Sequence, residues 1–183
     1  MYELMFDGLF HGPVETRRAG FMCIGWALFR QELQIGQGYG AIGRGRDATS
    51  HIAEYLALID GLQAILDLGI RHEPVRIVGD ARVVIEQMQG SARIATPRVA
   101  PLHRQALQLA ERLDQIEWYW VPRRRNKIAD RLTRRALRAI LDDSQQYEEA
   151  SAKILGEGSR SGSRFHELGG IMVLQPKRRN PPS

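Results

Sequence analysis

The spacing of apolar residues changes several times along the chain, and each change marks a different predicted element. Five short apolar runs, bounded by glycine, proline or charged residues, are typical of strands: 2–6, 19–29, 33–42, 74–78 and 116–121. Helical spacing governs four other segments: 50–69, 82–88, a stretch from the prolines at 97 and 101 to about 113, and 126–141. The pattern therefore predicts three strands, a helix, a strand, two helices, a strand and a helix.

This order predicts an α/β fold. Three successive strands favour an antiparallel meander, and the later alternation of strands and helices favours parallel neighbours. We therefore expect a five-stranded mixed sheet, three antiparallel strands and then two parallel ones, flanked by helices. After residue 143 the composition becomes polar and rich in Ser and Gly. We expect a catalytic domain over 1–143 and a polar, basic extension over 144–183, with a possible extra strand near 170–174.

Composition narrows the class of protein. The chain has 183 residues, 43% of them hydrophobic, which is enough for a core. Its formal charge of +5 favours a polyanionic partner, either nucleic acid or a membrane surface. Cys23 is the one cysteine, so no internal disulfide forms; we expect a small buried hydrophobe and a cytoplasmic protein. No run of roughly 18 apolar residues predicts a membrane span, and the N-terminus does not resemble a signal peptide.

Four acidic residues are notable for their positions. Asp7 ends the first predicted strand, Glu54 lies in the first turn of the long helix, Asp80 follows the fourth strand, and Asp130 lies early in the last helix. Each alone has an ordinary explanation as a cap, a turn residue or a partner of the helix dipole. Strand ends and helix starts can converge at one edge of a mixed sheet, however. Four carboxylates gathered there would repel one another unless divalent cations neutralised them, and Mg²⁺ prefers such oxygen ligands.

The residues around these acids carry a family resemblance. The motifs are FDGLF at Asp7, TSHIAE at Glu54, VGDARVV at Asp80 and VPRRRNKIADRLTRRAL at Asp130. From about residue 2 to 141 the chain resembles type I ribonuclease H, most closely the compact stand-alone archaeal and bacterial branch without a basic protrusion. The resemblance implies that the four acids bind two Mg²⁺ ions, which Mn²⁺ can replace. It implies an endoribonuclease, a monomer, that cuts the RNA strand of RNA–DNA hybrid duplexes and leaves 5′-phosphate and 3′-hydroxyl ends.

The same resemblance suggests a set of nucleic-acid contacts. The candidates are Gly8, Thr49, Ser50, His51, Arg123, Arg124, Arg125, Asn126, Arg134 and Arg135. The chain departs from the family pattern at some of these positions and beside the third acid. Ser50 and His51 replace two asparagines, Ala81 replaces a serine after the third acid, and the loop of Arg123 to Arg125 lacks the usual histidine. An arginine can hold a phosphate but cannot act as a general acid at neutral pH.

Positive charge is concentrated beside the fourth acid. Residues 123–138 contain eight Lys or Arg and one acid. A solvated helix face is the ordinary explanation, whereas a carboxylate site for nucleic acid needs positive neighbours for the phosphates. Arg131, Arg134, Arg135 and Arg138 are expected on the side of the last helix away from its apolar face.

Two other functions remain open at this point. One is a nuclease of the same fold that cuts double-stranded RNA or DNA, since fold alone does not determine the substrate. The other is a nucleic-acid-binding module with weak or lost catalysis. The presence of all four acids favours an enzyme, because a binding module does not need a costly carboxylate cluster.

Overall fold

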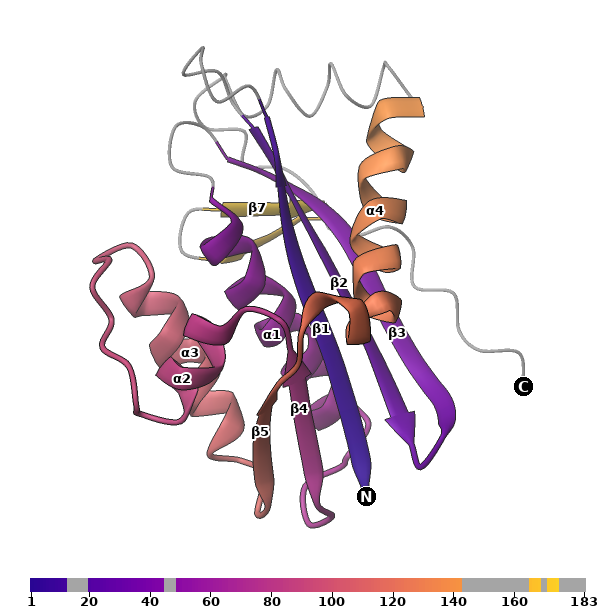
Figure 1. The fold of residues 1–183 in the computed structure, drawn as a ribbon, viewed down its shortest axis with the longest axis vertical. Helices are drawn as coiled ribbons and strands as arrows, with labels where there is room; N and C mark the ends of the chain where they lie inside the picture. The colour runs from indigo at the N-terminus through magenta and orange to yellow at the C-terminus, as the bar shows by residue number, and fades with distance from the viewer. Residues whose placement is uncertain (13–19, 45–48, 143–164, 169–170, 175–183) are drawn as a thin grey trace.

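The computed structural model describes residues 1–12, 20–44, 49–142, 165–168 and 171–174 (Figure 1). The strands are β1 (Tyr2–His11), β2 (Gly20–Arg30), β3 (Leu33–Arg44), β4 (Val75–Gly79), β5 (Ile116–Trp120), β6 (Phe165–Leu168) and β7 (Ile171–Leu174). The helices are α1 (Ser50–Asp67), α2 (Arg82–Met88), α3 (Ala100–Ala110), the 3₁₀ turn η1 (Arg123–Arg125) and α4 (Lys127–Asp142). The predicted order of elements is confirmed through α4.

One sheet contains all the strands of the described residues, in the order β5-β4-β1-β2-β3-β7-β6. β1, β2 and β3 pair antiparallel, and β1, β4 and β5 pair parallel. The five-stranded mixed sheet is therefore confirmed, with three antiparallel strands followed by two parallel ones. This arrangement places β1 at the centre of these five strands, between β4 and β2.

The C-terminal strand joins the far edge of this sheet. β7 pairs antiparallel with β3 through Ala41, Ile42 and Gly43, which accounts for the extra strand expected near 170–174. β6 pairs with β7 as a hairpin and was not predicted. The rest of the expected extension, residues 144–164, 169–170 and 175–183, lies outside the described residues, as does residue 143 at the end of the predicted domain.

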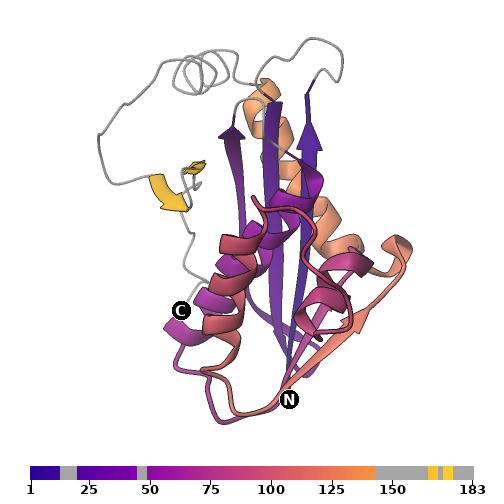
Figure 2. The same cartoon turned by 90° about the vertical axis from the view of Figure 1, so that its left-hand side faces the viewer.

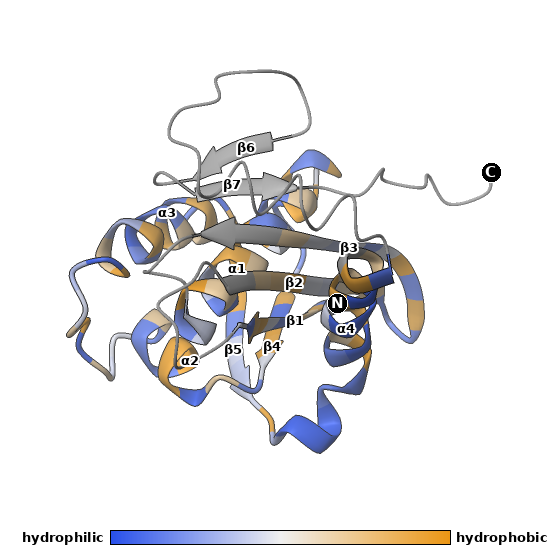
Figure 3. Cartoon of the chain, turned by 90° about the horizontal axis from the view of Figure 1, so that it is seen from above, coloured by the Kyte–Doolittle hydropathy of each residue, from blue (hydrophilic) through white to orange (hydrophobic). Residues whose placement is uncertain are grey.

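Helices cover the two faces of the sheet unequally. α1, α2 and α3 lie on one side and α4 on the other (Figure 3), and α1 and α3 run side by side (Figure 2). Large apolar side chains, among them Leu4, Phe6, Ile24 and Leu28, fill the layer between the sheet and α1. Because α1 is covered by the sheet on one side and by α3 on another, it is buried over most of its circumference.

The α4 face is built on small residues. A Cβ on Gly25 would lie 2.7 Å from the backbone nitrogen of Thr133, so the helix backbone rests almost directly on β2. Cys23, Ala41 and Ala136 form a small buried cluster there, and the prediction that Cys23 is a buried hydrophobe is confirmed. None of the helices in the described parts of the chain combines the length and apolar character that a bilayer crossing requires.

Candidate active site

Three of the four predicted acids come together beside the central strand. Asp7, Glu54 and Asp80 each offer a ligand atom within 4.8 Å of the others. β4 ends at Gly79, which pairs with Phe6, whereas β1 continues to His11 alongside β2. Asp7 therefore lies within β1 and not at its end, which corrects the sequence-based expectation. Beyond Gly79 the edge of β1 is no longer covered by β4, and there the carboxylates meet.

Gly8 allows α1 to approach this edge. A Cβ at Gly8 would lie 2.1 Å from the backbone nitrogen of Glu54, so any larger residue would collide with the backbone of α1. The Gly8 N–H also donates a hydrogen bond to the Glu54 carboxylate. The structure thus shows Gly8 as a packing residue that brings Glu54 beside Asp7, while its predicted contact with nucleic acid stays a prediction.

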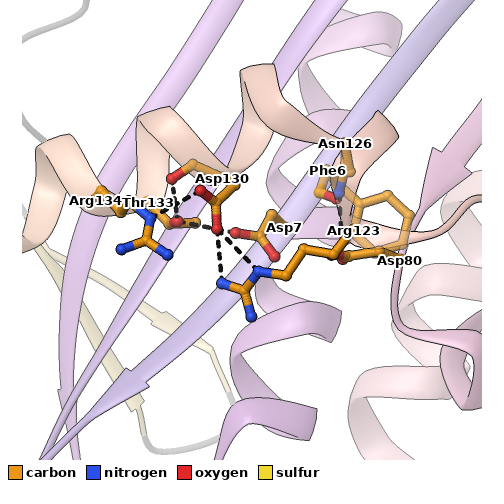
Figure 4. A network of polar contacts seen from close by, with 8 residues as sticks. All are labelled: Phe6, Asp7, Asp80, Arg123, Asn126, Asp130, Thr133 and Arg134. Atoms are coloured by element: carbon orange, nitrogen blue, oxygen red, sulfur yellow. Dashed lines mark hydrogen bonds and ion pairs between the residues drawn. The ribbon is translucent and has the colours of Figure 1, made fainter.

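Asp7 is a buried carboxyl, with 3% of its surface exposed. Thr133 on α4 donates a hydrogen bond to Asp7 Oδ2 at 2.8 Å (Figure 4). Burial, followed by the neighbouring Asp80, raises the pKa of Asp7 to about 6, against the opposing effects of Thr133 and Arg123. Sequence reasoning missed Thr133, because a threonine inside an amphipathic helix has no distinctive pattern.

Glu54 provides the test of whether these acids suit a cation. Burial, then the charges of Asp7 and Asp80, raise the pKa of Glu54 well above its ordinary value. Its Oε2 atom is buried and has no hydrogen-bond partner. A buried carboxylate oxygen without a partner is costly, and here it lies among two other carboxylates. Three oxygen donors of like charge with an unpartnered atom among them fit a hard divalent cation.

Asp80 is positioned by residues that come from the other end of the chain. Asn126 Nδ2 donates to Phe6 O at 2.7 Å, where β4 ends, and also to Asp80 Oδ1 at 3.3 Å. Trp120 Nε1 donates to the Asp80 carbonyl at 3.0 Å. Asn126 is fully buried, so the structure does not support its predicted contact with nucleic acid; its side chain instead braces the edge of β1 and Asp80.

Asp130 lies close to the three acids but is not among the group within 4.8 Å. Arg123 donates from Nε and Nη2 to Asp130 Oδ1 at 3.2 and 2.6 Å, and Arg134 Nε donates to Oδ2 at 2.8 Å (Figure 4). Partial burial raises the pKa of Asp130, but the hydrogen bonds from Arg134 and Arg123 outweigh it, so the pKa is lowered overall. The expectation of four clustered carboxylates is therefore met by three, with the fourth held by arginines.

The other predicted contacts lie near the start of α1 and along α4. Thr49 caps α1, accepting a hydrogen bond from the Ile52 N–H at 3.2 Å, and Ser50 beside it is exposed. His51 Nε2 lies 3.1 Å from Gln87 Oε1, so this ring is anchored to α2. The remaining candidates are all exposed arginines: Arg123, Arg124, Arg125, Arg134 and Arg135. Their contacts with nucleic acid stay predictions.

Comparisons with known proteins agree with this geometry. A family model described as reverse transcriptase-like matches residues 6–136. The bifunctional protein Rv2228c of Mycobacterium tuberculosis is 36% identical over 141 residues, which are 77% of this chain and 37% of that protein. The structure of its N-terminal RNase H domain, fused to maltose-binding protein, is 31% identical with a TM-score of 0.64, covering 74% of this chain and 97% of that one. The chain belongs to the type 1 ribonuclease H family.

Two further ribonuclease H structures support the fold. RNase H1 of the archaeon Halobacterium salinarum is 30% identical with a TM-score of 0.67, covering 75% of this chain and 98% of that one. LC11-RNase H1, solved in complex with an RNA/DNA hybrid, has a TM-score of 0.67 but 23% identity, covering 77% and 99%. Because its sequence identity is low, LC11-RNase H1 shows only that the fold is shared. This chain spans 37% of the length of the curated mycobacterial relatives that it matches.

Proposed function

We propose that this chain is a divalent-metal-dependent endoribonuclease that hydrolyses the RNA strand of RNA–DNA hybrids, leaving 5′-phosphate and 3′-hydroxyl ends. The observation that carries the proposal is the close group of Asp7, Glu54 and the partly exposed Asp80, in which the buried Oε2 of Glu54 has no partner. Such a group is unfavourable for stability and useful for binding cations. Membership of the ribonuclease H family supplies the reaction class.

The proposed metal ligands are Asp7, Glu54, Asp80 and Asp130, which would hold two Mg²⁺ ions or their Mn²⁺ replacements. Bound ions of this kind supply an activated water and neutralise charge on the leaving 3′ oxygen. The chain itself orients the ligands: Thr133 holds Asp7, and Asn126 and Trp120 hold Asp80. Because these donors come from α4, β5 and the turn between them, the site is complete only when the last third of the domain is folded.

A basic surface adjoins the acids and suits a phosphate backbone. We define this basic surface as the exposed cations of η1 and α4: Arg123, Arg124, Arg125, Lys127, Arg131, Arg134, Arg135 and Arg138. The turn and the outward side of α4 are largely hydrophilic in Figure 3. Arg135 is held over the ring of Tyr39 on β3, with its guanidinium carbon 4.8 Å from the ring centroid. Phosphate contacts of this kind provide affinity without sequence preference.

We infer that the start of α1 recognises RNA in the cut strand. Ser50 is exposed on the first turn of α1, four residues before Glu54. A hydroxyl there can exchange hydrogen bonds with a ribose 2′-hydroxyl, the group that distinguishes RNA from DNA. LC11-RNase H1, which shares this fold, was solved in complex with an RNA/DNA hybrid.

The decisive experiment is a cleavage assay on three labelled duplexes of one sequence: RNA–DNA hybrid, double-stranded RNA and double-stranded DNA. We expect the native chain to cut the hybrid with Mg²⁺ or Mn²⁺ and to leave 3′ ends that a polymerase can extend. Asp7→Asn keeps the shape but loses the charge, and should lower the rate about a thousandfold. Glu111→Gln, which changes an exposed carboxylate at the end of α3, is the matched control and should cut normally.

Other outcomes point to other functions. Preferential cutting of double-stranded RNA would identify a different nuclease on the same fold. Binding of hybrid that is equally tight with and without Mg²⁺, with no cutting of any duplex, would identify a nucleic-acid-binding module.

A further inference from the structure

The four acids of the site are compensated very differently. Asp7, Glu54 and Asp80 lie together, and one Glu54 oxygen has no hydrogen-bond partner. Asp130 has the opposite environment, since guanidinium groups engage both of its carboxylate oxygens. The arginine side chains therefore hydrogen-bond Asp130, the acid that lies outside the cluster of three neighbouring carboxylates.

Arg123 is the cation that links the two environments. Its guanidinium binds Asp130 Oδ1 through two nitrogens, and it lies close enough to Asp7 and Glu54 to lower the pKa of each. In Figure 4 it points toward Asp7 and Asp130 together. Its side chain is nevertheless 60% exposed and comes from the short η1 turn, so it can leave without disturbing the core.

We propose that Arg123 and Arg134 form a clamp that competes with a divalent cation for Asp130, with Arg123 as the exchangeable member. While the two arginines hold both oxygens of Asp130, fewer of its lone pairs remain for a cation, and the positive charge of the guanidinium groups repels that cation. Binding of a cation at Asp130 would release the Arg123 guanidinium into solvent, on the same side as the basic surface. The inference rests on the proposed function for its relevance, but it concerns cation affinity and is testable without any nucleic acid.

The clamp predicts that removing an arginine beside the metal site raises the affinity of the site for a cation. Removing Arg123 should tighten cation binding, because it frees one Asp130 oxygen and removes a nearby positive charge. Removing Arg134 should act in the same direction but less, because Arg134 contributes one of the three hydrogen bonds and lies one turn along α4. Exposed ion pairs are weak, so the expected gain for Arg123 is about fivefold and for Arg134 about twofold.

The test is a titration of the full chain with Mn²⁺ alone, in which electron paramagnetic resonance follows the free ion. The variants are Arg123→Ala, Arg134→Ala and Arg125→Ala. Arg125 is a matched control, since it is an exposed arginine on the same turn for which no ion pair is found among the described residues. A fourth variant, Asp130→Asn, is combined with Arg123→Ala so that the double-mutant cycle reports whether Arg123 acts through Asp130.

The clamp is supported if Arg123→Ala tightens Mn²⁺ binding about fivefold, Arg125→Ala does not, and the gain falls below about twofold in the Asp130→Asn background. It is overturned if Arg123→Ala leaves the affinity unchanged or weakens it. Equal gains from Arg123→Ala and Arg125→Ala, or a full gain in the Asp130→Asn background, would also overturn it, because they would show a general charge effect. Hybrid cleavage fails or succeeds independently of these results.

Discussion

The two faces of the sheet are built from different side chains. The α1 face forms the main apolar core, and the α4 face carries polar side chains of the site. On the α1 face, Leu4, Phe6, Ile24 and Leu28 are large, apolar and fully buried or nearly so. On the α4 face the buried apolar cluster is much smaller and consists of Cys23, Ala41 and Ala136, with the partly buried Leu9, Tyr39 and Leu137 packed against it. Asp7 and Thr133 lie on this second face, where they are hydrogen-bonded to each other.

This difference shows how one domain accommodates a buried carboxylate group. The α1 face buries enough apolar surface to hold the sheet and helices together. The α4 face gives up that stabilisation, because Gly25 and its small neighbours let the α4 backbone approach closely enough for Thr133 to reach Asp7. The acids meet at the edge that β4 leaves uncovered, where Glu54 from the first face comes beside Asp7 on the second.

The largest effect is expected at the contact between β1 and α1. Gly8→Ala would place a methyl group 2.1 Å from the Glu54 nitrogen, and the atoms it would meet are all backbone atoms of α1, which cannot move aside as a flexible side chain could. We expect a loss of about 3 kcal/mol or more in the free energy of unfolding, measured by urea denaturation. The control is Gly36→Ala on β3, whose Cβ would be 3.6 Å from the Trp26 ring and should cost little. Equal losses in both variants would mean that strand conformation, and not the approach of α1, is responsible.

The second-largest effect is expected from the ionisation of Asp7, which lowers the free energy of unfolding. The pKa of Asp7 is raised from 3.8 to about 6, so between these values the folded chain binds more protons than the unfolded one. The contribution of Asp7 to the free energy of unfolding is therefore fully present below its unfolded pKa of 3.8, and it is lost as the pH rises through about 6. In EDTA, Asp7→Asn should therefore be more stable than the native chain at neutral pH, by on the order of 2 kcal/mol, while losing activity.

Urea unfolding at about pH 4 and about pH 7.5 would check this, since the advantage of Asp7→Asn should nearly vanish at the lower value. Glu111→Gln, which alters an exposed carboxylate, should show no such difference. An Asp7→Asn variant less stable than the native chain at neutral pH would show that the carboxylate is not repelled in the folded state.

The smallest effect is expected at Thr133. Its hydroxyl lowers the pKa of Asp7 by hydrogen bonding, so Thr133→Val should raise that pKa further. The acid limb of the rate–pH profile should then move to higher pH by less than about one unit. Thr133→Ser keeps the hydroxyl and should restore the native profile. A normal profile in Thr133→Val would mean that the hydroxyl serves the Asp130 carbonyl, which it also approaches at 2.8 Å.

Local patterns were sufficient for much of this architecture. Apolar spacing predicted β2 to β5, α1, α2 and α4 to within a few residues, and it predicted the first half of β1, because strand and helix periods are local properties. The motifs around Asp7, Glu54 and Asp80 pointed to three acids that the structure brings together. They did not reveal that Asp7 lies within a strand, because the length of β1 depends on its pairing with β2 up to His11, while β4 ends at Gly79.

By itself, the sequence determined the order of the elements, the basic character of η1 and α4, and the identity of the acids. Only the tertiary structure decided what surrounds each acid. Asn126 reaches Phe6 and Thr133 reaches Asp7 across 120 and 126 positions of chain, and Arg123 and Arg134 hold Asp130. Burial, repulsion and hydrogen bonding act through space, so which carboxylate lacks a partner and which has two arginines is set by how the sheet and helices pack.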